Sequence, residues 1–314
     1  MIAFLLSSLP IFGIVALGWA AIRMQLAPPS LRDALGAFSF RFALPALVFR
    51  LIAGQPLGRS FDPIFYVGYL ASGGLIFALV FALSLIFDRP ACDRQAIAAA
   101  AARATTTTVS NLGFLGPPLM LAFFGDHGAG PLAMAILAEV MILLSLGGVI
   151  MGVSRDGGGN VAALVIRGTA QNPVVAAIVL GAILAATGLP LPAPIARFLD
   201  FLGGSAGPTA LFALGGALAA RPIDRSTAFT AAGIAAVKLV VCPIFVWYVL
   251  AHLLHVEPFW VQAGVLIASL PSAGNVYVLA QRYAADEERV SAAIVLSTAV
   301  SVVTVPLAAW LMLH

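Results

Sequence analysis

The stretch Ser110-Asn111-Leu112-Gly113-Phe114-Leu115-Gly116-Pro117-Pro118 decides how this chain folds. It lies in the middle of an apolar run near residues 95–124, where a continuous helix would otherwise form. Its two consecutive prolines remove two backbone donors and obstruct the preceding helical turn, and its two glycines add backbone freedom. We therefore predict a helix that is interrupted within this stretch.

The composition places this interrupted helix in a membrane. Of the 314 residues, 61% are hydrophobic and only 9% are charged, whereas soluble domains carry about a quarter charged residues. The apolar runs are about 20 residues long, which is the length that a helix needs to cross the hydrocarbon core. The expected fold class is therefore an all-α integral membrane protein.

Ten apolar runs are expected to form transmembrane helices. They lie near residues 2–22, 34–53, 63–87, 95–124, 131–153, 168–188, 198–219, 228–254, 259–283 and 289–313. The first run is interpreted as a retained helix, because it has no basic leader and no clear cleavage site. A glycine-rich segment near the midpoint divides the chain into a first five-helix repeat (1–154), a cytoplasmic linker (155–160) and a second five-helix repeat (161–314).

The arginines predict the orientation of these helices. With the N-terminus placed outside, eleven arginines, Arg103 near a helix end among them, fall on the cytoplasmic side and three on the opposite side. This bias follows the positive-inside rule and predicts a multi-pass protein of the cell inner membrane with both termini outside. Because each half has an odd number of helices, the second repeat is expected to be inverted. Arg41 and Arg103 fall within predicted helices, nearer their ends, and are expected to snorkel to the interface.

A second interrupted helix is predicted in the inverted half. The stretch Ser269-Leu270-Pro271-Ser272-Ala273-Gly274-Asn275 again combines proline, glycine, serine and asparagine within an apolar run. Paired interruptions in inverted repeats indicate the binding site of a transporter. Helix fragments that begin at a break present N–H groups and a partial positive charge, which suits an anion. The candidate substrate-binding residues are Asn111, Gly113, Gly116, Pro117, Pro271, Ser272 and Asn275. The alternative is a pair of ordinary proline kinks, with the asparagines patching the broken backbone.

Two ionisable residues stand alone in other predicted helices, Glu139 in the fifth and Lys238 in the eighth. Charged groups in lipid are costly and normally face a cavity or a partner. We expect the two residues to serve proton coupling or charge balance, with a structural ion pair, or polar contacts that hold helices together, as the alternative. The hydroxyl run from Thr105 to Thr108, with Ser110, is expected to hydrogen-bond back to its own helix.

Several other functions are not supported by the sequence. It contains no HExxH motif, no GxSxG motif and no pair of membrane aspartates, so we predict that the protein is not an enzyme. The two cysteines form no CxxC motif and the four histidines are spread along the chain, so no metal or other cofactor is expected. The net charge of +3 reflects arginines at helix ends, and no nucleic-acid partner is expected.

These features resemble the auxin efflux carrier family over the full length of the chain. The resemblance lies in the Asn111–Pro117 break, the Leu44–Phe49 run, Pro208 with Leu211-Phe212 and Gly215, Lys238 followed by Pro243, and the segment from Pro271 to Tyr283. The chain lacks a long central loop and so resembles the short prokaryotic branch, which includes malate and malonate permeases. The resemblance implies ten helices in two inverted repeats, with helices four and nine crossed. It also implies a scaffold of helices one, two, six and seven and a moving transport domain of helices three to five and eight to ten.

The function expected on these grounds is a secondary active transporter or permease for small organic anions that works by alternating access. Mono- and dicarboxylates such as malate or malonate, and auxin-like acids, are the expected substrates. The alternative is a sodium- or proton-coupled carrier of the bile-acid symporter or antiporter type with a different substrate. The lipid bilayer is the other expected partner, and a homodimer is left open.

Overall fold

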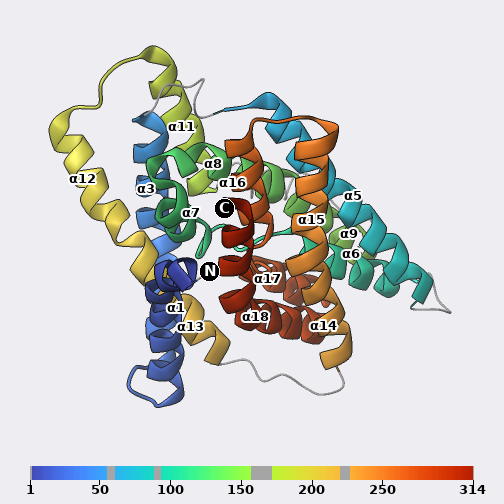
Figure 1. The fold of residues 1–314 in the computed structure, drawn as a ribbon. Helices are drawn as coiled ribbons and strands as arrows, with labels where there is room; N and C mark the ends of the chain where they lie inside the picture. The colour runs from blue at the N-terminus through green and yellow to red at the C-terminus, as the bar shows by residue number, and fades with distance from the viewer. Residues whose placement is uncertain (1, 55–60, 88–92, 157–171, 220–226, 314) are drawn as a thin grey trace. The chain divides into compact units, whose positions relative to one another are not determined.

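The structure, a computed structural model, describes residues 2–54, 61–87, 93–156, 172–219 and 227–313 (Figure 1). This described part of the chain is almost entirely helical and holds no β-strand beyond one isolated bridge between Ser110 and Ser272. The helices of the first half are α1 (Ile2–Arg23), α2 (Pro29–Phe38), η1 (Ser39–Ala43), α3 (Leu44–Ala53), α5 (Pro63–Phe87), α6 (Arg94–Thr108), α7 (Gly116–Phe124), η2 (Gly125–Gly128), α8 (Ala129–Ile136), η3 (Leu137–Leu143) and α9 (Leu144–Asp156).

The helices of the second half are α11 (Pro173–Thr187), α12 (Ala193–Gly204), α13 (Ala206–Ala219), α14 (Ala228–Ala236), η4 (Val237–Val241), α15 (Cys242–Trp247), η5 (Tyr248–Leu253), α16 (Pro258–Ala268), α17 (Gly274–Tyr283) and α18 (Glu287–Leu313). Local sequence sets several of their ends. The Asp93 side chain caps α6 by accepting a hydrogen bond from the Ala96 N–H (2.7 Å), and Asn172 caps α11 in the same way through the Val174 N–H (2.9 Å). Gly188 ends α11 in the left-handed conformation, with φ of 67°.

Six helices of the described chain are long and apolar enough to cross a membrane. They are Pro29–Ala53, Pro63–Phe87, Gly116–Ser154, Ala193–Ala219, Ala228–Leu253 and Glu287–Leu313. Shorter apolar helices cover Leu9–Arg23, Pro173–Thr187 and Pro258–Ala268. These findings agree with an all-α integral membrane protein. The count of ten spans and their inverted repeat stay predictions.

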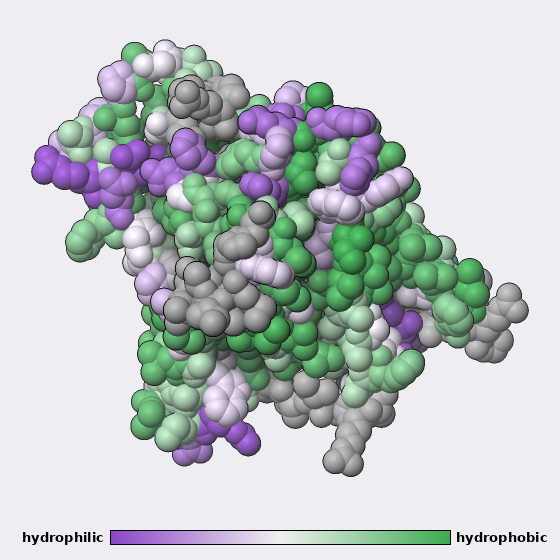
Figure 2. Space-filling model, viewed as in Figure 1, coloured by the Kyte–Doolittle hydropathy of each residue, from purple (hydrophilic) through white to green (hydrophobic). Residues whose placement is uncertain are grey.

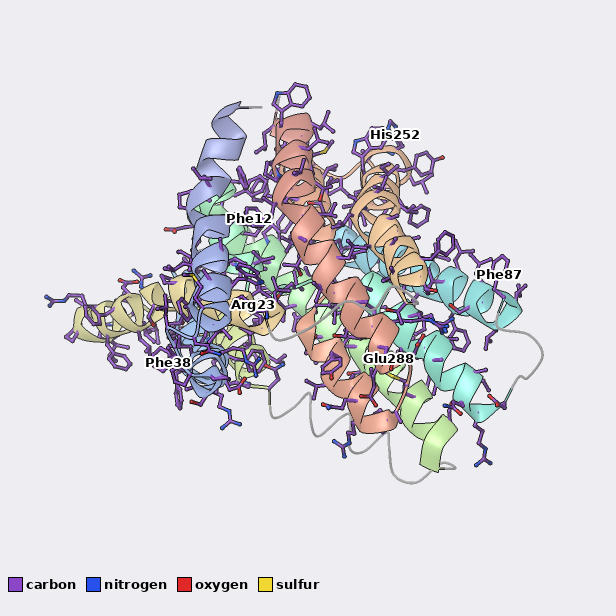
Figure 3. All side chains as sticks on the ribbon, turned by 90° about the horizontal axis from the view of Figure 1, so that it is seen from below. Phe12, Arg23, Phe38, Phe87, His252 and Glu288 are labelled. Carbon is purple, nitrogen blue, oxygen red and sulfur yellow. The ribbon has the colours of Figure 1, made fainter. Side chains whose placement is uncertain are left out.

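The surface also agrees with a lipid environment. Most of the face drawn in Figure 2 is apolar, and large side chains such as Phe201 and Phe229 are each 91% exposed. Some charged groups lie at helix ends, such as Arg23 in the last turn of α1 and Glu288 in the first turn of α18, which are labelled in Figure 3. Apolar faces with charged ends are typical of membrane helices.

The chain divides into two compact units. The first comprises Met1–Pro63, Leu112–Met134 and Ala170–Pro222, and the second comprises Ile64–Asn111, Ala135–Thr169 and Ile223–His314. The first unit thus contains the four helices that the resemblance assigns to a scaffold. It also contains Leu112–Met134, which the resemblance places in the transport domain. The division falls at the interruption of the fourth predicted helix.

Close backbone contact joins α1 to α13 in the first unit. A Cβ at Gly18 would collide with the Phe212 carbonyl oxygen, and a Cβ at Gly215 would collide with the Val15 carbonyl oxygen. The two helices therefore approach through glycines on both sides, as membrane helices do where small residues line the interface. In the same unit α3 packs against α11 and α12, and Arg50 of α3 pairs with Asp200 of α12 at 3.0 Å.

The second unit packs α6 against α9, α14 against α18 and α15 against α16. Its main apolar cluster includes buried residues of α6, α9, α17 and α18, among them Ala101, Met151, Val276 and Ile294. Within α6, the Arg103 guanidinium pairs with the carboxylate of Asp286, which precedes α18. Arg289 adds a second, longer contact to the same carboxylate, at 3.5 Å.

The structure corrects the expectations for Arg103 and Arg41, and most of the predicted linker lies outside the described residues. Arg103 does not snorkel: it is 6% exposed and ion-paired with Asp286. Arg41 is not near a helix end, because it lies in η1 at the middle of the helix Pro29–Ala53. Of the predicted linker, residues 155 and 156 belong to α9 and residues 157–160 lie outside the described residues. Five arginines used for the orientation also lie outside them, namely Arg59, Arg89, Arg167, Arg221 and Arg225.

Gly18→Ala is expected to lower the free energy of unfolding by about 1–3 kcal/mol. The added methyl group meets a backbone carbonyl of α13, which cannot rotate away. Thermal unfolding in detergent measures the change. Gly13→Ala on the same helix is the matched control, because nothing lies within 4 Å of its Cβ position. Equal melting temperatures for the two variants would contradict the close contact.

Candidate functional site

The two predicted interruptions are real and they cross each other. Helix α6 ends at Thr108 and α16 ends at Ala268, and an extended segment follows each. The two segments run antiparallel: the Asn111 N–H donates to the Pro271 carbonyl (2.8 Å) and the Ala273 N–H donates to the Val109 carbonyl (3.0 Å). Backbone groups released from the helices are thereby satisfied inside the protein, as an apolar surrounding requires.

Prolines account for the end of α16 and for the start of α7. Pro271 has no N–H to donate to the helix before it. Pro117 and Pro118 occupy the first turn of α7, where a missing N–H costs little. After the crossing, the chain starts α7 with prolines at positions where a helix does not need their N–H groups.

Glu139 lies against this crossing and is 1% exposed. Its carboxylate accepts three hydrogen bonds, from the Ser110 N–H (2.6 Å), the Ser110 hydroxyl (2.8 Å) and the Tyr69 hydroxyl (2.6 Å). The Ser110 N–H is one of the backbone donors that the break of the fourth predicted helix releases. A buried carboxylate with three donors is well satisfied.

Lys238, the only lysine of the sequence, completes the arrangement and is also 1% exposed. Its ammonium group donates to the Ser110 hydroxyl (2.6 Å) and to the carbonyl of Ala268 (3.2 Å), the last residue of α16. Ser110 thus joins the two charges, because its hydroxyl accepts from Lys238 and donates to Glu139. We call Tyr69, Ser110, Glu139 and Lys238 the charge bridge.

Both charged residues occupy π-helical turns. Glu139 lies in η3 and Lys238 lies in η4, each between two α-helical segments. A π-helical turn inserts a residue into a helix and often occurs at functional sites. These turns bring both side chains to the crossing without ending their helices.

A small cavity adjoins the charge bridge. Its volume is about 20 Å³, and Tyr69, Glu139, Lys238, Cys242 and Thr108 are among the residues that line it. That volume suits about one water molecule. Among the described residues, no group of three or more histidine, cysteine or acidic side chains could hold a metal ion.

The structure gathers some of the predicted site residues and separates others. Asn111, Pro271 and Ser272 meet at the crossing, where all three are buried. Asn275 is exposed in the first turn of α17. The remaining three, Gly113, Gly116 and Pro117, belong to the first unit. There Gly113 faces the Phe40 ring and Gly116 packs against Leu132.

Four of the backbone N–H groups at the crossing already have acceptors within the protein, which changes the predicted anion site. The backbone N–H groups of Ser110, Asn111, Ser272 and Ala273 all donate within the protein. They are thus not the open donors that the interruption of a helix predicts. The Ser272 hydroxyl differs: it is fully buried and, within the described residues, has no hydrogen-bond partner. The role of these residues in binding stays a prediction.

Tyr69 and Ser110 are the site residues that the sequence did not reveal. Each threonine from Thr105 to Thr108 donates to the carbonyl four residues earlier, as expected. Ser110 instead bonds to Glu139 and Lys238, so the expectation is wrong for this residue alone. A polar residue just beyond the end of a broken helix has lost its i−4 carbonyl partner, and that signal is present in the sequence.

Lys238→Met is expected to lower the free energy of unfolding by about 3–5 kcal/mol, because it leaves the Glu139 carboxylate buried without a cation. Adding Glu139→Gln to this variant should recover part of the loss. Thermal unfolding in detergent tests both. Arg289→Met is the control, since its contact with Asp286 is long, 3.5 Å, and its own side chain is 39% exposed, so that the contact is worth about 1 kcal/mol or less. Losses that simply add in the double variant would count against the charge bridge.

Comparison with known proteins agrees with this architecture. A family model described as "Membrane transport protein" matches residues 3–309. The chain is 33% identical over 300 residues to the protein named "Putative malonate transporter" from Rhizobium meliloti (strain 1021), covering 95% of this chain and 92% of that protein. It is 26% identical over 307 residues to "Uncharacterized transporter YfdV" from Escherichia coli (strain K12), covering 95% and 94%. It is 30% identical over 200 residues to an "Uncharacterized transporter" from Methanothermobacter thermautotrophicus, covering 63% of each chain.

The family and these relatives are transporters, which confirms the prediction that the protein is not an enzyme. Interrupted helices that meet within apolar spans are typical of secondary transporters. The chain belongs to the membrane transport protein family of the auxin efflux carriers and is a multi-pass membrane protein.

Proposed function

We propose that this protein carries small organic anions, mono- or dicarboxylates such as malonate or malate, across the membrane by alternating access. The observation that carries the proposal is the antiparallel crossing of two interrupted helices beside a buried charge bridge. Interrupted helices at mid-membrane are the usual site of substrate binding in secondary transporters. The name of the Rhizobium meliloti relative supports malonate as the first substrate to test.

The start of α17 is the best anion site at this crossing. This helix has ten residues, begins at Gly274 and has no proline in its first turn, so its N–H groups are present. α7, by contrast, begins with two prolines that offer no N–H. Backbone N–H groups and the helix dipole favour a carboxylate at such a terminus. The exposed amide of Asn275 and the hydroxyl of Ser272 are further donors nearby in the sequence.

The charge bridge would serve coupling and charge balance. With Glu139 ionised and Lys238 protonated, the bridge has no net charge, so a bound anion meets little repulsion. Protonation of Glu139 would leave the Lys238 charge in excess and strengthen the attraction for an anion. Both residues hold the crossing through Ser110, so a change in protonation acts directly on the segments that would bind substrate.

The wider architecture that we propose follows the sequence. It has ten transmembrane helices in two inverted repeats, residues 1–154 and 161–314, joined by a cytoplasmic linker. The protein would lie in the cell inner membrane with both termini outside, as the distribution of its arginines favours.

Malonate at a hundredfold excess over its Kd is expected to stabilise the purified protein by about 2.7 kcal/mol. A thermal-shift screen in detergent with malonate, malate, succinate and indole-acetate measures this effect. Asn275→Ala should reduce the shift, because it removes an amide donor from the first turn of α17. Gln281→Ala, an exposed amide later in the same helix, is the matched control. A flat screen with well-folded protein would remove the support for organic anions.

Glu139→Gln is expected to abolish the acceleration of malonate uptake by an inward proton gradient, because a glutamine cannot carry the proton. Uptake into proteoliposomes at several external pH values measures this. The titratable and charged groups facing Glu139 are Tyr69 and Lys238, and Cys242 lines the same cavity. Glu257→Gln is the control, since Glu257 is exposed and its side chain caps no helix. Unchanged pH dependence in Glu139→Gln would exclude the coupling role.

A further inference from the structure

Arg41 lies at the middle of a candidate membrane span, where an unpaired charge costs the most free energy. It is the thirteenth of the 25 residues of the candidate span Pro29–Ala53, so twelve residues separate it from each end. At 1.5 Å per residue this is roughly 18 Å, farther than an arginine side chain reaches. The nearest charged residues along the helix are Asp33 and Arg50. An ionisable group at this depth is normally functional and faces a wet cavity or a partner.

The guanidinium lies on the face that the first unit leaves uncovered. Ser39 and Ala43, two residues to either side, are 1% and 0% exposed, and the Ser39 hydroxyl donates to the Ala206 carbonyl of α13 (3.2 Å). Arg41 itself is exposed. Side chains two residues apart on a helix lie on nearly opposite faces. The core of the unit therefore takes the Ser39 face and leaves the Arg41 face open.

Arg41 also differs from three other cations of the membrane segments. Arg50 pairs with Asp200, Arg103 pairs with Asp286, and Lys238 belongs to the charge bridge. Within the ranges that the structure describes, no ion pair or hydrogen bond involves the Arg41 side chain. A mid-span cation that faced lipid alone would cost several kcal/mol. Arg41 on the uncovered face of η1 therefore needs water and an anion as its partners.

The residue next to Arg41 along the chain, Phe40, lies close to the segment that follows the first interruption. Phe40, its neighbour, lies 3.9 Å from the Cβ position of Gly113, within the break itself and in the same unit. Arg41 belongs to η1, which like η3 and η4 is a π-helical turn that carries a charged residue within a span. Phe38 and Phe42, with ring centroids 6.2 Å apart, lie three residues before and one residue after Arg41 along the chain and are both exposed.

We infer that Arg41 binds the carboxylate of the transported acid. A guanidinium can hold a carboxylate through two parallel N–H···O bonds, which fixes its orientation as well as its charge. One bound carboxylate neutralises the excess charge on the η1 face, so the ligand class is an organic acid with at least one ionised carboxylate. This inference rests on the proposed transport of organic anions and adds a binding residue to it.

Uptake of labelled malonate into proteoliposomes tests the inference. Arg41→Gln is expected to raise the KM at least about tenfold, equivalent to the loss of one charged contact. Arg41→Lys keeps the charge but not the two-pronged geometry, so its KM should rise less. Arg197→Gln is the matched control in the same unit, because Arg197 is exposed near the start of α12. Its KM should stay within about twofold of the wild type.

A labelling experiment separates a wet face from a lipid face. In a Cys92→Ser background, Arg41→Cys is treated with a membrane-impermeant thiol reagent, and the remaining native thiol, Cys242, is buried. Labelling that malonate slows is the expected result. If Arg41→Gln does not fold, Arg41→Lys and the labelling decide the matter.

Three outcomes would overturn the inference. Absence of labelling would show that the η1 face meets lipid. If the wild type transports malonate and Arg41→Gln has an unchanged KM, Arg41 is not a binding residue. The proposed function is not affected by that result. Wild-type protein that carries none of malonate, malate, succinate and indole-acetate would remove the proposed function and this inference together.

Discussion

The structure depends on one constraint: a helix that is interrupted within an apolar chain must find partners for the backbone groups it releases. Two interruptions solve this together, because the segments after Thr108 and after Ala268 run antiparallel and exchange N–H···O bonds. The pairing is short, so that the Ser110 N–H bonds outside it, to the Glu139 carboxylate, and the Ser272 N–H bonds to the Ser297 hydroxyl.

The charge bridge follows from this geometry. Once Glu139 is buried, a cation must accompany it, and Lys238 does so through the Ser110 hydroxyl while also satisfying the carbonyl at the end of α16. Buried ion pairs add little to stability compared with apolar residues of the same size. Ser110 is at once part of the crossing and the link between the two charges. A movement of the crossing therefore changes the surroundings of both.

Charge is handled differently at other places along the chain. Arg103 and Asp286 neutralise each other where α6 meets the turn before α18, and this pair holds elements of one unit together. Arg41 has no such partner in the described chain, although it stands at the middle of a span. Arg103 and Asp286 thus have a structural role, whereas we infer that Arg41 binds a ligand. Close glycine contacts between α1 and α13 show that the unit carrying Arg41 is tightly packed rather than loosely assembled.

The sequence alone determined the class of the protein and the positions of its interruptions. Apolar runs force helices in lipid, and prolines with glycines break them, and both effects are local. It also singled out Glu139 and Lys238, since isolated charges in apolar runs are visible without a structure. Only the tertiary structure decided that Ser110 and Tyr69 join these charges, that Arg103 is paired, and that Arg41 stands at mid-span. Such pairings link residues up to 183 positions apart, as in Arg103 and Asp286, and the pattern of neighbours along the chain does not encode them.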